Sequence, residues 1–469
     1  MIRLAALLAA LVVTAVAAST ATAAERMWMG FHDDPVLRYE GDRQNQLNLT
    51  VQPNGATMIR TLVEWHRLAT TRPANPSDSF DPAYRWDDLD ELVRNAQTRG
   101  QEVLMTIWGT PGWANGNKRP QFLPTNLSDF TSFARALASR YSGQFPGFPY
   151  AGFYGIWNES NLGSFLQPQF NSSGKIVSPA NYARLAAAGI AGIKAGNPRA
   201  LVAIGETSSN GRDRKRIGLT DSIAPATFAK GVATANKRLK FDAWAQHPYP
   251  FPVNSAATQK ARYPNVTLSS LPQFGKDLDT WFGRKNLPIW VTEYGHETRP
   301  GEPKGVTEAK QAVYVQQAIA MAKANPRVPM FIWFVFEDSQ GSLWQSGLYR
   351  SNGTAKPAQS RWAALARPLD ARNKKITVKG GVANPPVSLN VREFCATSPP
   401  GVLVGSTARV RLNGRLVGVS QPAGPLGVNC TIAIRLPVKV AKKKTYVATI
   451  NLNTDAGGIA VRTVTIVGV

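Results

Sequence analysis

Apolar runs with the composition of β-strands alternate with helical patterns along most of this chain, and this alternation restricts its fold more than any other feature. A helical pattern of the kind that separates these runs spans residues 82–100 and ends at Gly100. Alternating strands and helices specify a parallel sheet covered by helices, and eight such strands close a (β/α)8 TIM barrel, of class α/β. The eight apolar runs are residues 27–31, 57–63, 103–108, 154–158, 200–205, 241–246, 289–292 and 330–336.

Two of the predicted strands end in a glutamate. Residues 153–161 read FYGIWNESN and reach Glu159, and residues 288–295 read PIWVTEYG and reach Glu293. Either glutamate alone is most simply a surface residue at a strand end. Two buried strands that each deliver a carboxylate to the same end of a barrel instead provide the acid/base and the nucleophile of a retaining glycosidase.

The motifs around these glutamates resemble those of glycoside hydrolase clan A, whose members are retaining (β/α)8-barrel glycosidases with acid/base and nucleophile at the ends of strands four and seven. Residues 157–159 (WNE) resemble the strand-four motif and residues 292–295 (TEYG) the strand-seven motif. The resemblance spans residues 27–366 and looks closest to family 39 or family 5, although strand three lacks the histidine that many members carry. It implies substrate-binding roles for Arg60, Asn158, His247, Tyr249 and Trp333.

The resemblance implies that Glu159 is the acid/base and that Glu293 is the nucleophile of a double displacement at an O-glycosidic bond, with Asn158 bound to a sugar 2-hydroxyl. Arg60 and Tyr249 are the groups expected to keep Glu293 ionised. His247 is expected to orient Glu159 or to line the site, with a packed strand-end histidine as the alternative. Trp333 is expected to stack beneath the sugar whose bond is cut. Five further aromatic residues are candidates for subsites, with core packing as the alternative for each: Trp65, Trp108, Trp113, Phe165 and Trp344.

Other chemistries lack the residues that they need. The four histidines show no H-E-x-x-H or paired-cysteine spacing, and neither a G-x-S-x-G elbow nor a phosphate-binding glycine loop occurs. We therefore expect no metal and no cofactor. The resemblance implies a carbohydrate substrate that is β-linked. The alternative is a non-catalytic carbohydrate-binding or cell-surface adhesion protein on a barrel scaffold, which the presence of both glutamates argues against.

The first 24 residues have the features of a cleaved signal peptide. Arg3 precedes an apolar stretch over residues 4–18, and Ala21 and Ala23 supply small residues before the expected cleavage site. A membrane anchor is the alternative, which this short and Ala-rich stretch disfavours. We expect a secreted protein with no integral membrane segment after cleavage and with its catalytic barrel in residues 25–368.

Residues 369–469 differ in character from the rest of the chain. They are rich in Val, Thr and Gly in short alternating runs, and Asn413-Gly414 is a hairpin signal, so we expect a small all-β sandwich domain of the immunoglobulin or carbohydrate-binding type. Both cysteines of the chain, Cys395 and Cys430, lie here. In an exported protein they favour one disulfide, worth about 4 kcal/mol, with two buried thiols as the alternative.

Charge is unevenly distributed. The chain has a formal net charge of +24, and residues 371–469 contain 14 Lys or Arg against two acidic residues. This basic C-terminal domain is predicted to associate with an anionic polymer or with cell-envelope material, and a solvated basic face is the alternative. Nucleic acid is not expected as a partner, because residues 440–446 (VAKKKTY) offer only a weak version of the interleaved aromatic and basic residues that it needs.

Overall fold

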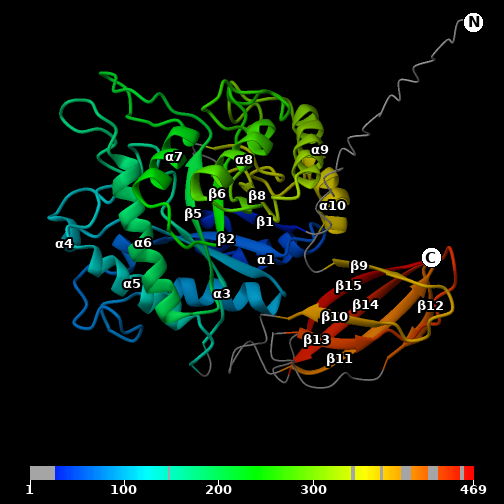
Figure 1. The fold of residues 1–469 in the computed structure, drawn as a ribbon. Coiled ribbons are helices and arrows are strands. Elements are labelled where there is room, and N and C mark those ends of the chain that lie inside the picture. Colours follow the sequence, from blue (N-terminus) through cyan, green and yellow to red (C-terminus); the bar gives the residue numbers. More distant parts are fainter. Residues whose placement is uncertain are drawn as a thin grey trace, which may run out of the picture.

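The computed structural model describes residues 27–145, 148–339, 344–369, 373–391, 403–420, 431–454 and 459–469 (Figure 1). Eight parallel strands pair in chain order, and β8 pairs with β1 to close a barrel. The predicted (β/α)8 barrel is therefore confirmed. Its strands are β1 (Trp28–His32), β2 (Met58–Glu64), β3 (Glu102–Trp108), β4 (Phe153–Ile156), β5 (Leu201–Ser208), β6 (Ala243–His247), β7 (Ile289–Val291) and β8 (Met330–Phe334).

Helices surround the barrel (Figure 1). Side-chain caps begin two of them, because Asn126 accepts a hydrogen bond from the backbone N–H of Ser128, and Thr307 accepts one from that of Lys310. The α-helices are α1 (Arg43–Val51), α2 (Trp65–Leu68), α3 (Asp87–Thr98), α4 (Gly112–Asn115), α5 (Leu127–Arg140), α6 (Ser178–Gly196), α7 (Pro225–Ala235), α8 (Leu271–Phe282), α9 (Glu308–Ala324) and α10 (Pro357–Leu369). The π-helix η1 (Pro35–Tyr39) follows β1, and the 3-10 helix η2 (Leu268–Ser270) precedes α8.

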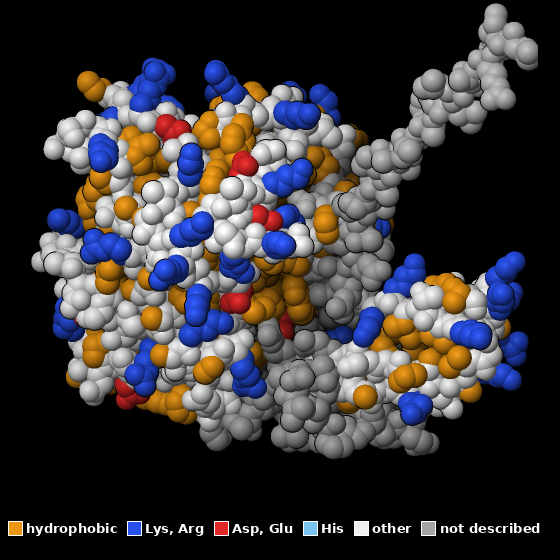
Figure 2. Space-filling model, in the orientation of Figure 1, with side chains coloured by type: hydrophobic (Ala, Val, Ile, Leu, Met, Phe, Trp, Pro, Cys, Tyr) orange, Lys and Arg blue, Asp and Glu red, His pale blue; other side chains and the backbone are white. Residues whose placement is uncertain are grey.

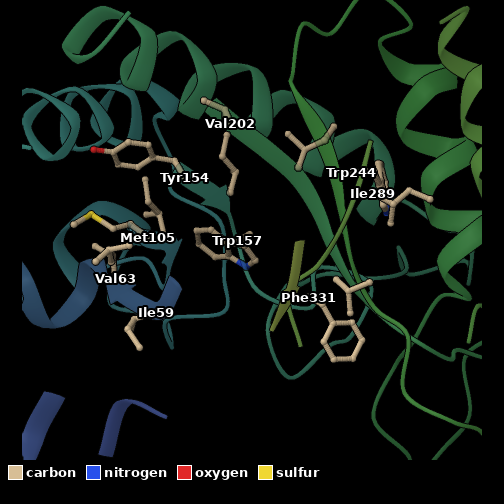
Figure 3. Close-up of a cluster of buried hydrophobic side chains, with 14 of the residues drawn as sticks. Ile59, Val63, Met105, Tyr154, Trp157, Val202, Trp244, Ile289 and Phe331 are labelled. Carbon is tan, nitrogen blue, oxygen red and sulfur yellow. The ribbon is translucent and has the colours of Figure 1, made fainter. Parts of the chain in front are cut away.

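Side chains on each barrel strand alternate between two cores. On β2, Met58 lies in the apolar cluster inside the barrel, whereas Ile59 and Val63 pack between the barrel and its helices. Figure 3 shows part of this outer core, with Val63 beside Met105 of the next strand. Arg60 comes two residues after Met58, so the same alternation turns its side chain into the barrel, nearer the carboxyl ends of the strands.

Beyond α10 the chain forms an all-β domain. Strands β12, β11, β14, β15 and β9 form one sheet, and β10 pairs with β13 in another. Residues of both sheets share one hydrophobic cluster, as in a β-sandwich. Asn413 and Gly414 turn β11 into β12 with positive φ angles of 49° and 80°, as the hairpin signal predicted. The strands are β9 (Asn373–Val378), β10 (Pro386–Asn390), β11 (Leu403–Leu412), β12 (Arg415–Val419), β13 (Thr431–Arg435), β14 (Thr445–Thr454) and β15 (Ile459–Gly468).

Two of the sequence predictions fall on residues outside the described ranges. The expected signal peptide, residues 1–24, precedes the first described residue, and Cys395 and Cys430 both lie outside the described part of the C-terminal domain. Within the described ranges, every helix is too short or too polar to cross a bilayer.

Candidate active site

A pocket of about 790 Å³ opens at the carboxyl ends of the barrel strands. Loops and strand ends from around the barrel line it, among them His32 at the end of β1, Glu159 after β4 and Glu293 after β7. In a (β/α)8 barrel this face carries the chemistry, because the loops after the strands converge there.

Glu159 and Glu293, which are 134 residues apart in the sequence, meet in this pocket. One carboxylate oxygen of Glu159, one ring nitrogen of His247 and one carboxylate oxygen of Glu293 all lie within 4.8 Å of one another. Each carboxylate is partly accessible, since 15% of the Glu159 side chain and 10% of the Glu293 side chain is exposed. Both can therefore reach a bound molecule from the pocket walls.

Glu293 is held as an anion. Arg60 donates a hydrogen bond from Nη1 to its Oε1 at 2.6 Å, and the Tyr249 hydroxyl donates to its Oε2 at 3.1 Å. Burial alone would raise the pKa of Glu293, but the positive charges of His247 and Arg60 hold this pKa well below its usual range. Burial and the charge of Glu293 raise the pKa of Tyr249, so Tyr249 stays a neutral donor.

Arg60 organises the floor of the pocket. Its guanidinium is fully buried and also donates from Nη2 to the side-chain oxygen of Asn158 at 2.8 Å. The ring nitrogen Nδ1 of His32 lies 2.6 Å from Nη1 of Arg60. One arginine thus positions residues from the ends of β1, β4 and β7, as a planar group with five donors can.

His247 stands between the two glutamates. Its Nδ1 lies 3.2 Å from Oε1 of Glu159 and 3.5 Å from Oε2 of Glu293. Burial on its own lowers the pKa of His247, but the charge of Glu293 and hydrogen bonds to Glu159 and Glu206 raise this pKa to about 9. The alternative of a merely packed strand-end histidine does not fit, because both ring nitrogens face carboxylates.

The sequence reading missed a third carboxylate, that of Glu206 on β5. It is fully buried, and its Oε2 lies 3.1 Å from Nη2 of Arg60 and 3.1 Å from Nε2 of His247. Residues 201–206 read LVAIGE, an apolar run that ends in a glutamate, which is the signal that identified Glu159 and Glu293. The predicted strand ended at Gly205, whereas β5 continues to Ser208. The sequence therefore did not predict Glu206 as a site residue.

Trp333 does not form the expected sugar platform. On β8, Ile332 lies inside the barrel, so Trp333 points outward, where it is fully buried beside Trp362 of α10. Its indole N–H donates to the carbonyl of Ser346. The prediction is wrong because, in a strand whose residues are all apolar, the sequence does not show which face of the sheet each side chain occupies. Phe334, one residue later, lines the pocket instead.

The other predicted aromatic residues divide into two groups. Phe165 and Trp344 line the pocket. Trp65, by contrast, is a core residue stacked on Phe133 and fully buried. Trp108 and Trp113 are partly buried outside the pocket lining, where Trp108 packs against Phe165, and Trp113 lies beneath the guanidinium of Arg72. Trp65 thus takes the core-packing alternative, whereas Trp108 and Trp113 do not line this pocket and stay candidates for a subsite outside it.

The pocket lining differs in composition from the rest of the basic surface. Lys and Arg side chains are spread over the surface (Figure 2), whereas the described residues that line the pocket include neither. Arg60 lies beneath this lining and already places a positive charge against Glu293, which leaves that carboxylate unsuited to binding a metal ion. The lining contains six carboxylates: Asp33, Asp34, Glu64, Glu159, Glu293 and Glu337.

Comparison with known proteins identifies a family. The model of the cellulase family, glycosyl hydrolase family 5, matches residues 20–338. None of the curated proteins matches the chain.

Several solved structures share its fold. A family 39 glycoside hydrolase from Bacteroides cellulosilyticus is 18% identical with a TM-score of 0.55, over 88% of this chain and 80% of that one. The GH5_18 enzyme from Streptomyces cattleya, solved with GlcNAc, is 16% identical with a TM-score of 0.53, over 76% of this chain and 86% of that one. A β-xylosidase from Caulobacter crescentus is 15% identical with a TM-score of 0.50, over 92% of this chain and 97% of that one. At such identities the likeness concerns the fold.

Proposed function

The chain belongs to the cellulase family, glycosyl hydrolase family 5 of clan A, and we propose that it is an exported, retaining glycosidase that hydrolyses a β-linked glycoside or polysaccharide. Glu293 is the nucleophile and Glu159 the acid/base. The observation that carries this proposal is the spacing of the pair, since an oxygen of Glu159 and one of Glu293 lie within 4.8 Å. Retaining glycosidases have carboxyl groups about 5 to 5.5 Å apart, whereas inverting ones need about 6.5 to 9.5 Å to admit a water molecule.

The reaction then has two steps. In the first, the Glu293 carboxylate attacks the anomeric carbon while Glu159 gives its proton to the departing glycosidic oxygen, which leaves a glycosyl ester on Glu293. In the second, the Glu159 carboxylate takes a proton from water as the water oxygen attacks the anomeric carbon and frees Glu293. Arg60, Tyr249 and His247 support the first step because they keep Glu293 ionised.

The stereochemistry of the first product tests this assignment. Hydrolysis of an aryl β-glycoside followed by proton NMR should show the β-anomer first, with the α-anomer appearing only by mutarotation. If the α-anomer appears first, the enzyme inverts and Glu293 is not a nucleophile. The alternative of a non-catalytic carbohydrate-binding protein predicts no hydrolysis at all, and the hydrogen-bonded network around both glutamates argues against it.

We propose further that the sugar cut in this pocket is uncharged. The described pocket lining has six carboxyl groups and no Lys or Arg. Burial raises the pKa of Asp33 and Glu337 to about 7, and Glu159 carries the proton for the first step. The pKa of Asp34 and of Glu293 is lowered, however, so these two are anions. A uronic acid would place a further negative charge beside them. Like charges brought together in this way cost several kcal/mol. The basic surface would then serve attachment to anionic material, as predicted for the C-terminal domain, and not recognition of the cleaved sugar.

A matched pair of substrates tests the charge of the sugar. A p-nitrophenyl β-glucoside and the corresponding β-glucuronide differ only at carbon 6, and we expect kcat/KM to be about 100-fold higher for the neutral compound. The same comparison between xyloside and glucoside shows how much of a difference comes from size alone. Equal or faster hydrolysis of the glucuronide would overturn this proposal and leave the retaining mechanism untouched.

A further inference from the structure

Glu206 is placed so that it can have no contact with the molecule that is cut. Its side chain is fully buried and does not line the pocket. Four hydrogen bonds occupy its two oxygens. Oε2 accepts from Arg60 at 3.1 Å, from the Thr292 hydroxyl at 2.8 Å and from Nε2 of His247 at 3.1 Å, and Oε1 accepts from the Thr106 hydroxyl at 3.1 Å.

The backbone departs from regular strand geometry to place this side chain. Glu206 has a positive φ of 46°, which is rare for a residue other than glycine, and the register between β5 and β6 shifts at this point. On the neighbouring strand β4, Gly155 leaves the space that Glu206 fills, because a Cβ at Gly155 would stand 2.3 Å from Oε1 of Glu206. A bulge and a glycine on adjacent strands thus both accommodate one buried carboxylate.

Glu206 makes His247 a donor through both ring nitrogens. A carboxylate only accepts hydrogen bonds, so Nε2 of His247 must carry a hydrogen toward Glu206. Nδ1 faces Glu159 and Glu293, and it can donate as well only when the ring is protonated. The positive charge of Arg60 opposes protonation of the ring. Of the neighbouring titratable groups, His32 contacts Arg60, and Tyr249 contacts Glu293.

The charges balance throughout the proposed reaction. Before reaction, the positive charges of Arg60 and His247 face the negative charges of Glu206 and Glu293. In the glycosyl-enzyme, Glu293 is a neutral ester and Glu159, having given up its proton, is a carboxylate. The negative charge has therefore moved from Glu293 to Glu159, and Nδ1 of His247 lies within 3.5 Å of an oxygen of each.

We infer that Glu206 is a positioning residue: it keeps His247 protonated, so that one ring N–H serves Glu293 and Glu159 in turn as the negative charge passes between them. This role rests on the proposed retaining function. The charges of Glu159 and Glu293 change during the two steps, whereas Glu206 stays a carboxylate throughout.

The pH dependence of activity tests the inference. The pKa of His247 is raised to about 9, so the protonated ring is kept below pH 9 and is lost as the pH rises through that value. For a dinitrophenyl glycoside, whose leaving group needs little protonation from Glu159, we expect kcat/KM of the wild-type enzyme to fall above about pH 9. In Glu206→Gln the fall should begin one to two pH units lower, because the loss of an adjacent opposite charge shifts a buried group by about that much. At pH 8 the variant should then be about two- to tenfold slower, depending on the size of the shift.

A second measurement needs no substrate and so separates this inference from the proposed function. The chain has only four histidines, and the ¹⁵N NMR shifts of His247 can be assigned by their loss in His247→Gln. In Glu206→Gln, the pH at which His247 titrates should fall by the same one to two units. Gly155→Ala, which retains every polar side chain, should shift the titration in the same direction because it displaces Glu206.

Asp90→Asn is the matched control. Asp90 is a buried carboxylate on α3 that is paired with Arg140 at 2.6 Å and bonded to the Tyr141 hydroxyl, and it has no contact with the pocket. Asp90→Asn and Glu206→Gln are both expected to lower Tm, but Asp90→Asn should leave both pH profiles where they are. If His247 titrates at the same pH in wild type and Glu206→Gln, or if Asp90→Asn shifts its titration equally, Glu206 does not hold the charge of His247 and the inference fails.

Discussion

Glu293→Gln is expected to reduce kcat by about 10⁴-fold or more for every glycoside that the wild-type enzyme hydrolyses. The amide is close to the carboxylate in shape, but it cannot form the glycosyl ester. No neighbour is expected to take over as nucleophile. Of the two carboxylates that face the glycosidic bond, Arg60 and Tyr249 donate hydrogen bonds to Glu293 and not to Glu159. The loss should be as great for an activated aryl glycoside as for a natural one.

Glu297→Gln is the control for this variant. Glu297 is a buried glutamate four residues further along the same segment, it is bonded to Asn254, and it does not line the pocket. It should keep wild-type activity within a few-fold, and Tm should show that both variants are folded. Residual activity of Glu293→Gln above a hundredth of wild type, in a preparation free of deamidated protein, would mean that another group attacks the sugar.

Glu159→Ala should have an effect that depends on the leaving group. Without a proton donor, hydrolysis of a glycoside with an alcohol leaving group should fall by about 10³-fold, within the usual range for general acid catalysis. A dinitrophenyl glycoside needs little protonation, so formation of its glycosyl-enzyme should be nearly as fast as in wild type. The second step should then limit turnover, because no base activates the water, and a burst of dinitrophenol should precede slow steady-state release.

Azide distinguishes the two glutamates. In Glu159→Ala it can occupy the space of the lost side chain and attack the glycosyl-enzyme, which gives a β-configured glycosyl azide and restores turnover. In Glu293→Ala it can only attack the substrate directly, which gives the α-configured azide. A β-azide from Glu293→Ala, or an α-azide from Glu159→Ala, would reverse the assignment of the two residues.

The architecture of the barrel followed from local patterns alone. Each strand is an apolar run bounded by turn residues, each helix carries its own periodicity, and the order of strands in a closed parallel barrel is the order of the chain. The positions of Glu159 and Glu293 followed for the same reason. A residue that ends a barrel strand must lie at the carboxyl-terminal face, whichever way the helices pack.

Side-chain direction did not follow from the sequence. Residues 330–334 of β8 read MFIWF, in which every residue is apolar, so nothing in the pattern shows that Trp333 faces the helices and Phe334 the pocket. Trp65 is similar, since it follows a strand end in sequence but lies in α2 with its ring against α5. The sites of these aromatic rings depend on register and packing, which involve distant parts of the chain.

The network beneath the pocket depended on tertiary structure entirely. Arg60 is 146 residues from Glu206 and 233 residues from Glu293 in the sequence. Only closure of the barrel brings Arg60 within hydrogen-bond distance of both. The sequence by itself determined the barrel, its active face and two of its carboxylates, because periodicity and strand order are local properties. Only the folded structure decided that a third carboxylate is buried with them, because a bulge in β5 and the space at Gly155 on β4 turn Glu206 inward.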